Sequence, residues 1–134
     1  MNADDLVVLD ASVGVKWFRA ELGRERSLDL LRSAQTGDTR IAVPTHFVHE
    51  VLSVVERRDD TGHLIRAWDL IQAARIAVVP LTDDVVREAA AQCEALGCSF
   101  YDALAPAVAA LLGATLVSAD ARAHGAYPGV RLIG

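Results

Sequence analysis

The sequence predicts a three-layer α/β/α domain in which helices cover both faces of a central parallel β-sheet. Short, continuously apolar segments alternate with longer segments of helical periodicity, and this pattern is typical of a parallel sheet buried on both faces. Hydrophobic residues make up 52% of the 134 residues and charged residues 23%, which favours a compact core. No repeat or Pro/Gly/Ser linker divides the chain, so we expect one domain over residues 1–134.

The N-terminal half alternates strand and helix. The segment "LVVL" (6–9) is rich in β-forming residues, and the apolar periodicity after it predicts a helix over 13–20. A leucine-rich amphipathic stretch predicts a second helix near 25–34. The segment "RIAVP" (40–44) predicts the second strand, and the threonine that follows it can cap a helix over 45–59.

The C-terminal half continues the alternation. Apolar runs predict strands at 76–81, 114–118 and 130–133. Helical periodicity predicts helices at 62–75, 83–96 and 100–112. Gly97 and Gly113 follow the last two helices directly and are typical of helix C-termini. Because open α/β sheets bind ligands beyond the carboxyl ends of their strands, functional residues are expected just after each strand.

The charge balance limits the kind of nucleic-acid chemistry that is possible. The net charge of −5 argues against a protein that coats nucleic acid, since such proteins present a basic face. It does not argue against a metal-dependent nuclease. Two bound divalent cations would reduce the net charge to −1, with the change concentrated where a phosphate must lie.

The longest uncharged segment does not fit a membrane span. The 17 residues from Ala103 to Ala119 carry no charge, whereas a span needs about 20 apolar residues. Pro106, Gly113 and the β-like "ATLVS" within it indicate a buried helix, a turn and a strand instead. The opening "MNADDLVVLD" has acids where a signal peptide has basic residues, so we expect a cytoplasmic protein.

The cysteines and histidines do not form a zinc signature. Cys93 and Cys98 are five residues apart with no histidine close in sequence, so we expect two reduced structural thiols. His46 and His49 lie close to Glu50, but the order His-x-x-His-Glu lacks the spacing of zinc proteases. We interpret both histidines as structural or rim residues.

Four acidic residues lie in apolar surroundings. Asp10 follows the first strand directly, and Asp120 lies two residues beyond the strand at 114–118. Glu50 interrupts the otherwise apolar helix that begins after the second strand, and Asp102 lies in the first turn of the helix at 100–112. Because each neighbourhood predicts burial, the four carboxylates are candidates for one cluster.

Divalent cations would make such a cluster stable. Buried carboxylates without partners are costly, and Mg²⁺ or Mn²⁺ prefers oxygen ligands and keeps several waters. An acidic pocket of this composition is typical of metal-assisted phosphodiester hydrolysis.

Each acid also has a purely structural interpretation. Asp10 can be a turn or capping residue before an N-cap at Ser12. Asp102 can belong to a capping box, Asp120 can cap a short helix, and Glu50 can lie at the rim of an amphipathic helix. We expect any one of these acids to be purely structural more readily than all four at once.

With these residues assembled, the sequence resembles the PIN-domain ribonucleases, and more narrowly the VapC-type toxins of toxin–antitoxin modules. "LVVLDASVGVKWF" resembles the first strand and aspartate motif of the family and assigns its first acid to Asp10. "VPTHFVHEVLSVV" is similar to the second motif, around Glu50. "SFYDALAPAVA" and "LVSADARA" match the third and fourth motifs, around Asp102 and Asp120. The four motifs follow in order along nearly the whole chain.

The resemblance implies a PIN-like fold and an Mg²⁺- or Mn²⁺-dependent endoribonuclease that cuts a structured RNA, such as transfer or ribosomal RNA. It also implies a homodimer that a cognate VapB-like antitoxin silences by placing a basic side chain in the acidic pocket. Asp10 and Asp102 would lie closest to the metal, and Glu50 and Asp120 would complete the pocket or bind through water.

Four further residues are candidates for supporting roles. By the same resemblance, Ser12 and Ser118 can hydrogen-bond around the metal ligands. Lys16, the only lysine, lies one helical turn beyond Ser12 and can reach a phosphate or an acidic residue, with a solvated helix face as the alternative. Arg122 can contact RNA or a product phosphate in the same way.

Pro106 departs from the family pattern. It removes the N–H that would pair with the carbonyl of Asp102, so either the helix bends there or it begins near Pro106. This residue supports an alternative function, a PIN-fold binding partner without significant catalysis that acts through antitoxin or RNA contacts.

A third interpretation is a phosphatase with Asp10 as its nucleophile. Such an enzyme is expected to have a second acid two residues after the nucleophile, but this sequence has Ser12 at that position.

Overall fold

The computed structural model describes residues 5–58 and 61–134, and the strands in them form one parallel sheet. The strands are β1 (Leu6–Leu9), β2 (Arg40–Pro44), β3 (Ala77–Val79), β4 (Thr115–Ser118) and β5 (Arg131–Leu132). Their order is β3-β2-β1-β4-β5, and every pair of neighbours is parallel. The predicted parallel α/β sheet is therefore confirmed.

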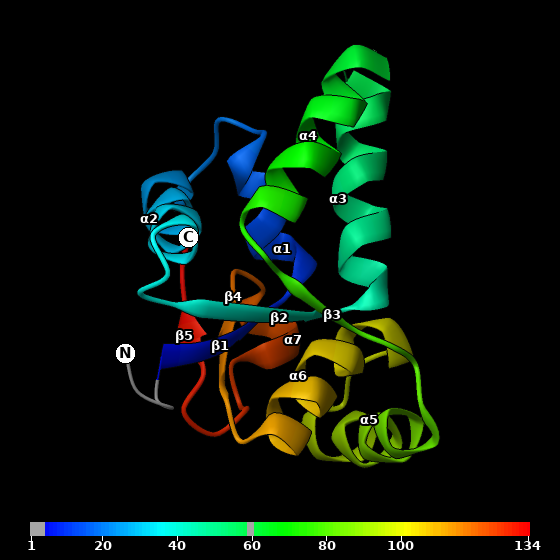
Figure 1. Cartoon of the computed structure of the whole chain (residues 1–134). Helices are drawn as coiled ribbons and strands as arrows, with labels where there is room; N and C mark the ends of the chain where they lie inside the picture. Colours follow the sequence, from blue (N-terminus) through cyan, green and yellow to red (C-terminus); the bar gives the residue numbers. More distant parts are fainter. Residues whose placement is uncertain (1–4, 59–60) are drawn as a thin grey trace.

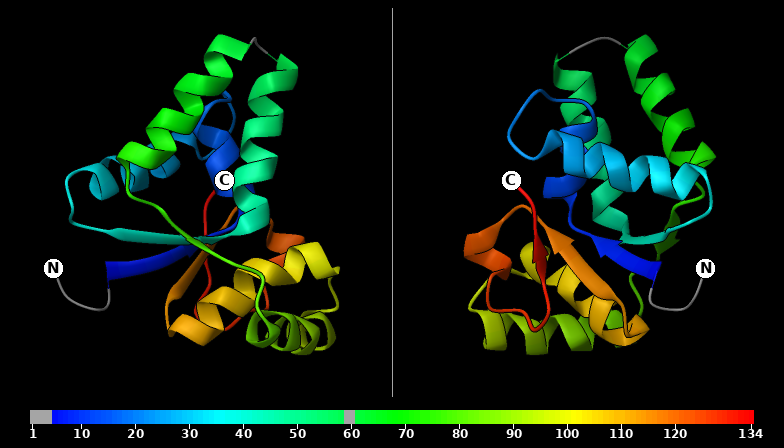
Figure 2. Two further views of the ribbon diagram at one scale, coloured as in Figure 1. Left: turned by 45° about the vertical axis from the view of Figure 1, so that its right-hand side comes forward. Right: turned by 90° about the vertical axis from the view of Figure 1, so that its left-hand side faces the viewer.

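Helices cover both faces of this sheet. They are α1 (Ala11–Gly14), the 3₁₀ helix η2 (Val15–Trp17), α2 (Arg24–Gln35), α3 (Thr45–Arg58), α4 (Thr61–Ala73), α5 (Asp83–Leu96), α6 (Phe100–Leu112) and α7 (Ala121–His124). α1 to α4 lie on one side of the sheet, and α5 and α6 lie on the other (Figures 1 and 2). The three-layer arrangement is the predicted one.

The two layers of helices enclose separate cores. Leu9 of β1 packs with Phe47 and Ile71 in the core on the α1–α4 side. Val8, its neighbour in the strand, packs with Leu104 and Leu116 on the α6 side. Successive side chains of a strand point to opposite faces, so a continuously apolar strand serves both cores at once. This explains why "LVVL" has no polar face.

The first helix differs most from its prediction. A helix was expected over 13–20, but α1 begins directly after Asp10 and the helical segment ends at Trp17 as a 3₁₀ turn. The reason is local, because the Asp10 carboxylate accepts a hydrogen bond from the Ser12 N–H and caps the helix two residues earlier than the apolar pattern indicates.

The ends of the other helices and strands lie closer to the positions predicted from the sequence. Gly97 and Gly113 end α5 and α6 in the left-handed conformation, with φ of 66° and 62°, as predicted. β3 and β5 are shorter than the apolar runs that predict them. Asp59 and Asp60, where the third predicted helix was expected to end, lie outside the described residues.

A glycine lets α1 approach α3 closely. A Cβ added to Gly14 would lie 2.4 Å from Cζ of Phe47 and 2.8 Å from Cγ2 of Val51, so a side chain there would displace buried groups. α1 follows Asp10 and α3 carries Glu50, so this contact sets the distance between two of the predicted site elements.

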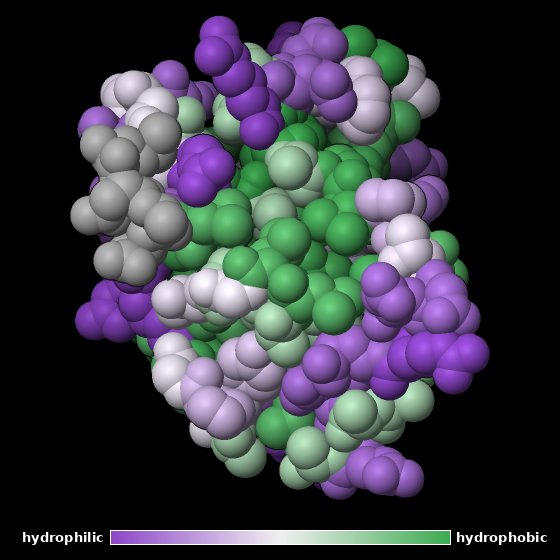
Figure 3. Space-filling view, turned by 60° about the horizontal axis from the view of Figure 1, so that its bottom comes forward, coloured by the Kyte–Doolittle hydropathy of each residue, from purple (hydrophilic) through white to green (hydrophobic). Residues whose placement is uncertain are grey.

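The surface over α5 and α6 is partly apolar. Figure 3 shows hydrophobic residues gathered across this face, and the exposed apolar side chains of the two helices include Val86, Leu111 and Leu112. Within the described ranges, no single helix has the length and apolar composition to cross a membrane. α5 and α6 pass that test only as a pair, which is bent by 111°.

Candidate functional site

Asp10 and Asp120 follow two neighbouring strands at the centre of the sheet. β1 and β4 pair in parallel, with Leu9 opposite Val117, and the backbone N–H of Asp10 donates to the Val117 carbonyl at 3.0 Å. From β1 the chain continues to β2 on one side of this strand pair, and from β4 it continues to β5 on the other side. Open α/β sheets bind their ligands at such a reversal of strand order. The sheet therefore brings both acids to one edge.

Both aspartates also cap the short helix that follows them. Oδ2 of Asp10 accepts the Ser12 N–H at 3.0 Å, and Oδ1 of Asp120 accepts the Ala123 N–H at 3.0 Å. Each cap uses one carboxylate oxygen, and the other oxygen has no hydrogen-bond donor among the described residues. The capping interpretation and the ligand interpretation are thus compatible.

Asp102 is held at the start of α6 by its backbone. Its N–H donates to Oγ of Ser99 at 3.2 Å, which is one half of a capping box. Its carboxylate accepts no hydrogen bond from the described part of the chain, so the reciprocal half is not made. The side chain of Asp102 is therefore available for a ligand.

Pro106 lies inside α6 and does not mark its beginning. The helix runs from Phe100 to Leu112 with Ser99 as its N-cap, so a helix that begins near Pro106 is excluded. The carbonyl of Asp102 is instead paired with Nε2 of His124 at 2.6 Å. The backbone around Asp102 keeps its helical form and a hydrogen bond.

Asp102 and Asp120 line a common pocket of about 300 Å³. The guanidinium-bearing Arg122 lines it as well, together with Cys98 and Ser99. Two carboxylates and one basic side chain in a small polar hollow suit a phosphate bridged to a cation. Arg122 is thus next to the acids, as the sequence led us to expect.

Glu50 lies apart from this pocket and is exposed, although its apolar neighbourhood predicted burial. Consecutive residues of a helix are turned by about 100°, so Glu50 points to the side while Val51 enters the core. It lines a larger hollow of about 530 Å³ with His46, Phe100 and Tyr101. The expectation that all four acids are buried holds only for Asp10, since Glu50 is exposed and Asp102 and Asp120 are half-buried.

His46 lines the larger hollow beside Glu50. It is buried, and its Nδ1 has no hydrogen-bond partner among the described residues. Burial lowers the pKa of His46 below its ordinary value, although the charges of Glu50, Asp10 and Asp102 act in the opposite direction. Three predicted site acids from three elements thus act on one imidazole, which the sequence led us to interpret only as a structural or rim residue.

The donor atoms suit a hard cation. In the described ranges, no three Asp, Glu, His or Cys side chains lie close enough to hold a metal ion without rearrangement. The available donors are nevertheless carboxylate oxygens, which Mg²⁺ and Mn²⁺ prefer and supplement with water. Burial, with smaller effects of Cys93 and Asp102, raises the pKa of the Cys98 thiol, which disfavours a thiolate ligand in the same pocket.

Both predicted serines bind the loop that carries Asp120. Oγ of Ser12 accepts the Ala119 N–H at 3.0 Å, and Oγ of Ser118 accepts the Asp120 N–H at 3.0 Å. Ser118 also lies 2.6 Å from Nδ1 of His124. These contacts fix the backbone around an acid of the pocket.

Lys16 is not brought to the acids. It is buried, and its ammonium lies 3.1 Å from Oε1 of Glu21 and 2.5 Å from the carbonyl oxygen of Leu22. The expected alternative, a solvated helix face, is also wrong, because the 3₁₀ turn folds the side chain against the 21–22 loop.

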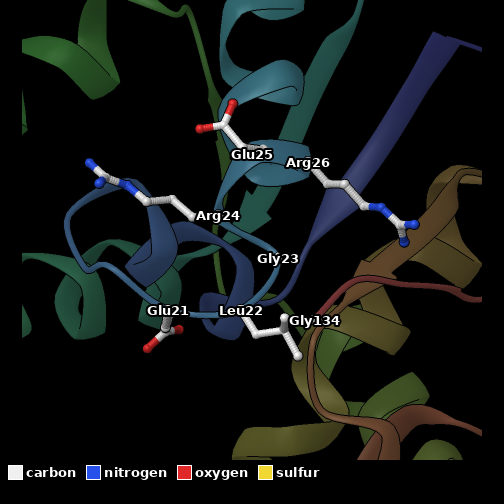
Figure 4. Close-up of a pocket in the computed structure, with 7 residues that line it drawn as sticks. All are labelled: Glu21, Leu22, Gly23, Arg24, Glu25, Arg26 and Gly134. Atoms are coloured by element: carbon white, nitrogen blue, oxygen red, sulfur yellow. The ribbon is translucent and has the colours of Figure 1, made fainter.

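A separate hollow of about 500 Å³ lies beside this loop. It is lined by residues 21–26 and Gly134. Figure 4 shows the side chains of Arg24 and Arg26 pointing to opposite sides, away from each other. None of the four predicted acids lines it, so it does not share the site described above.

His124 is the residue that sequence reasoning missed. It is fully buried, and its two ring nitrogens contact Ser118 and the carbonyl of Asp102. One signal could have found it. Pro106 removes a donor four residues after Asp102, so a replacement donor was required, and the histidine four residues after Asp120 was available.

Comparison with known protein families gives one match. The model of the PIN domain matches residues 7–127. This range contains every predicted acid and most of the described fold. No curated protein sequence matches the chain significantly.

Solved structures of toxin–antitoxin proteins share the fold. A chain of a toxin–antitoxin complex from Klebsiella pneumoniae superposes with a TM-score of 0.75 at 14% identity, covering 92% of this chain and 94% of the other. VapBC2 from Rickettsia felis, solved bound to a promoter DNA fragment, gives 0.67 at 17% identity over 95% and 96% of the two chains. VapC20 from Mycobacterium tuberculosis, described as a sarcin-ricin loop cleaving toxin, gives 0.68 at 18% identity over 93% and 98%. At such identities the likeness establishes the fold.

Proposed function

Because the chain belongs to the PIN domain family, we propose that it is a single-domain, metal-dependent endoribonuclease toxin of the VapC kind. It cleaves a phosphodiester of a structured RNA, such as transfer or ribosomal RNA, and is neutralised by a cognate VapB-like antitoxin. The family match supports nuclease chemistry in general, and the toxin–antitoxin structures of the same fold support the narrower assignment.

One observation carries the proposal. Asp102 and Asp120 line one pocket with Arg122, and Asp10 directly follows β1, the strand beside β4, at the same edge of the sheet. A binding protein would have no need of carboxylate oxygens left without hydrogen-bond donors beside a basic side chain. A site for metal-assisted phosphodiester hydrolysis needs both kinds of group.

The roles of the residues follow from these positions. Asp10, Asp102 and Asp120 would hold Mg²⁺ or Mn²⁺, and Glu50 would complete the site through water. When bound, such an ion lowers the pKa of a water molecule and balances the negative charge that develops on the phosphate. Arg122 would donate hydrogen bonds to phosphate oxygens.

Supporting side chains would act on the position of Asp120. Ser12 and Ser118 accept N–H groups of the loop that carries this acid and would keep its carboxylate directed into the pocket. Lys16 has no role at the RNA in this proposal, because its ammonium binds Glu21 and the carbonyl of Leu22.

The alternative, a catalytically weak PIN-fold binding partner, loses its main support. That alternative rested on Pro106 disturbing the aim of Asp102. α6 continues through Pro106, and the Asp102 carbonyl has a donor in His124. We therefore favour the nuclease.

The proposed partners follow from the surfaces. A basic antitoxin side chain would neutralise the acids of the pocket, which explains how a short segment can silence the enzyme. A homodimer would cover the apolar side chains Val86, Leu111 and Leu112 of α5 and α6 (Figure 3). The two free cysteines and an RNA substrate agree with a cytoplasmic location.

Cleavage of RNA tests the proposal directly. Antitoxin-free protein would be incubated with end-labelled total RNA in Mg²⁺, Mn²⁺ or EDTA, and the cut ends mapped. We expect discrete cuts that require metal and disappear in Asp10→Asn. Asp69→Asn removes the same charge from the exposed side of α4 and serves as the control. Folded protein that cuts no RNA under any of these conditions would contradict the nuclease and favour the binding partner.

A further inference from the structure

Pro106 opens a gap in the hydrogen bonds of α6. A residue in a helix interior donates its N–H to the carbonyl four residues earlier, and proline has no N–H to donate. At position 106 the carbonyl that loses its donor belongs to Asp102. Residues 103–109 are all buried, so water cannot easily take the place of the missing N–H along this stretch of the helix.

His124 fills this gap from another element. Its Nε2 lies 2.6 Å from the Asp102 carbonyl oxygen, and the residue has no exposed surface. A carbonyl oxygen can only accept, so Nε2 is the nitrogen that carries the proton in this contact. The imidazole thus does for Asp102 what the N–H of an ordinary residue at position 106 would do.

The other ring nitrogen, Nδ1, is connected to the backbone of Asp120 through the hydroxyl of Ser118. In the neutral ring Nδ1 accepts from the hydroxyl of Ser118 at 2.6 Å, and that hydroxyl oxygen accepts the Asp120 N–H at 3.0 Å. The backbone N–H of His124 also donates to the Asp120 carbonyl at 3.0 Å. A continuous set of hydrogen bonds therefore joins the backbone of Asp102 to the backbone of Asp120.

We propose that His124 is a positioning residue, which replaces the helix hydrogen bond lost at Pro106 and so fixes Asp102 opposite Asp120. The inference rests on the proposed function, because it matters for catalysis only if the pocket of these two acids is the active site. It assigns a role in the reaction to a side chain that touches neither the pocket nor a substrate.

A double-mutant cycle between positions 106 and 124 tests this role. Pro106→Ala restores an N–H for the Asp102 carbonyl, and His124→Met removes the donor while filling a similar volume with an adaptable side chain. The measurements are the rate of RNA cleavage, the urea midpoint and the ¹³C chemical shift of the Asp102 carbonyl. His124→Gln, which keeps an N–H donor, is the conservative variant.

We expect His124→Met to slow cleavage by about 100-fold in the protein with Pro106, because a displacement of about 1 Å costs this much. In the Pro106→Ala background the same change should cost much less, and the carbonyl shift should return toward that of the wild type. His124→Gln should retain more activity than His124→Met. His124→Met also removes the hydrogen-bond partner of Ser118, and it does so whether position 106 is proline or alanine. The loss of activity from that contact should therefore be equal in the two backgrounds.

Additive losses would overturn the inference. If His124→Met has the same effect with proline and with alanine at position 106, the imidazole acts only by packing. Leu116→Ala removes a buried side chain from the same core and should be additive with Pro106→Ala. If His124→Met does not fold, folding of the double variant supports the inference. If neither folds, a folded and active His124→Gln supports it and an unfolded one overturns it.

The carbonyl shift separates this inference from the proposed function. A wild-type protein that cuts no RNA, but whose Asp102 carbonyl shift responds to position 124 only when proline is at position 106, would refute the nuclease and retain the contact. A protein that cuts RNA but shows an additive cycle would refute the role of His124 alone.

Discussion

The hydroxyl of Ser12 accepts a hydrogen bond from the backbone N–H of Ala119 at 3.0 Å, although 107 positions separate the two residues. Ser12 follows β1, and Ala119 lies between β4 and Asp120. One half-buried contact therefore connects the loop of the first acid to the loop of the last.

Ser12→Ala should destabilise the protein by about 1 kcal/mol, because the Ala119 N–H loses its acceptor in a partly buried place. Urea unfolding at neutral pH measures the change. Ser53→Ala removes an exposed hydroxyl from α3 and should be nearly neutral. Equal stabilities of the two variants would show that the contact does not hold the loop.

Mn²⁺ should raise the melting temperature of the wild-type protein, because it binds the folded state through acids that are separated in the unfolded chain. At a concentration 100 times its dissociation constant, an ion stabilises by about 2.7 kcal/mol. Asp10→Asn should fold normally, since asparagine caps a helix as well as aspartate does, but it should lose this response. Asp69→Asn should keep it. A wild-type melting temperature that does not respond to Mn²⁺ would argue against a metal site.

Substitutions of Asp120 should separate its cap from its charge. Asp120→Asn keeps an oxygen for the Ala123 N–H and should retain stability, whereas Asp120→Ala should lose about 1 kcal/mol. Both should weaken Mn²⁺ binding, because both remove the carboxylate. The two quantities are read from urea unfolding and from the Mn²⁺ dependence of the melting temperature. An alanine variant as stable as the asparagine variant would exclude a structural role for the cap.

Lowering the pH should destabilise the protein through protonation of His46. Burial lowers the pKa of His46 below its ordinary 6.5, against the opposing charges of Glu50, Asp10 and Asp102 and with the same sign as His49. As the pH falls through 6.5, the unfolded chain takes up the proton first, so stability is lost down to the lower pKa of the folded state.

His46→Gln removes this proton uptake. The wild type should therefore lose more stability between about pH 7.5 and about pH 5.5 than the variant does, as measured by urea unfolding at each pH. His49→Gln, which removes an exposed histidine of the same helix, is the control. A wild type and a His46→Gln variant with parallel pH dependence would contradict the assigned direction of the shift.

Local patterns predicted the layers of the fold but not every side-chain direction. "LVVL" and "RIAVP" have no polar face, and that feature alone requires a sheet covered on both sides. Glu50 shows the limit, because a helical position at the edge of an apolar face can turn to solvent. Lys16 shows another, since its partners depend on how the 21–22 loop folds back.

The residues around the acids were predictable to different degrees. Asp10 and Asp120 could be assigned to one edge of the sheet because each follows a strand. The contact between His124 and Asp102 could not, because it joins two helices 22 residues apart and depends on their tertiary packing. Its cause, the proline at position 106, was nevertheless visible in the sequence.

The strand order also determines when the site can form during synthesis. β1 occupies the centre of the sheet, yet one of its two neighbours is β4, whose Val117 pairs with Leu9. Contacts between such distant parts of a chain form late and slow folding. A nascent chain on the ribosome cannot bring Asp10 beside Asp120 until the segment that carries β4 and Asp120 has emerged. The acidic site of this fold can therefore form only after β4 and the loop that carries Asp120 are available to pair with β1.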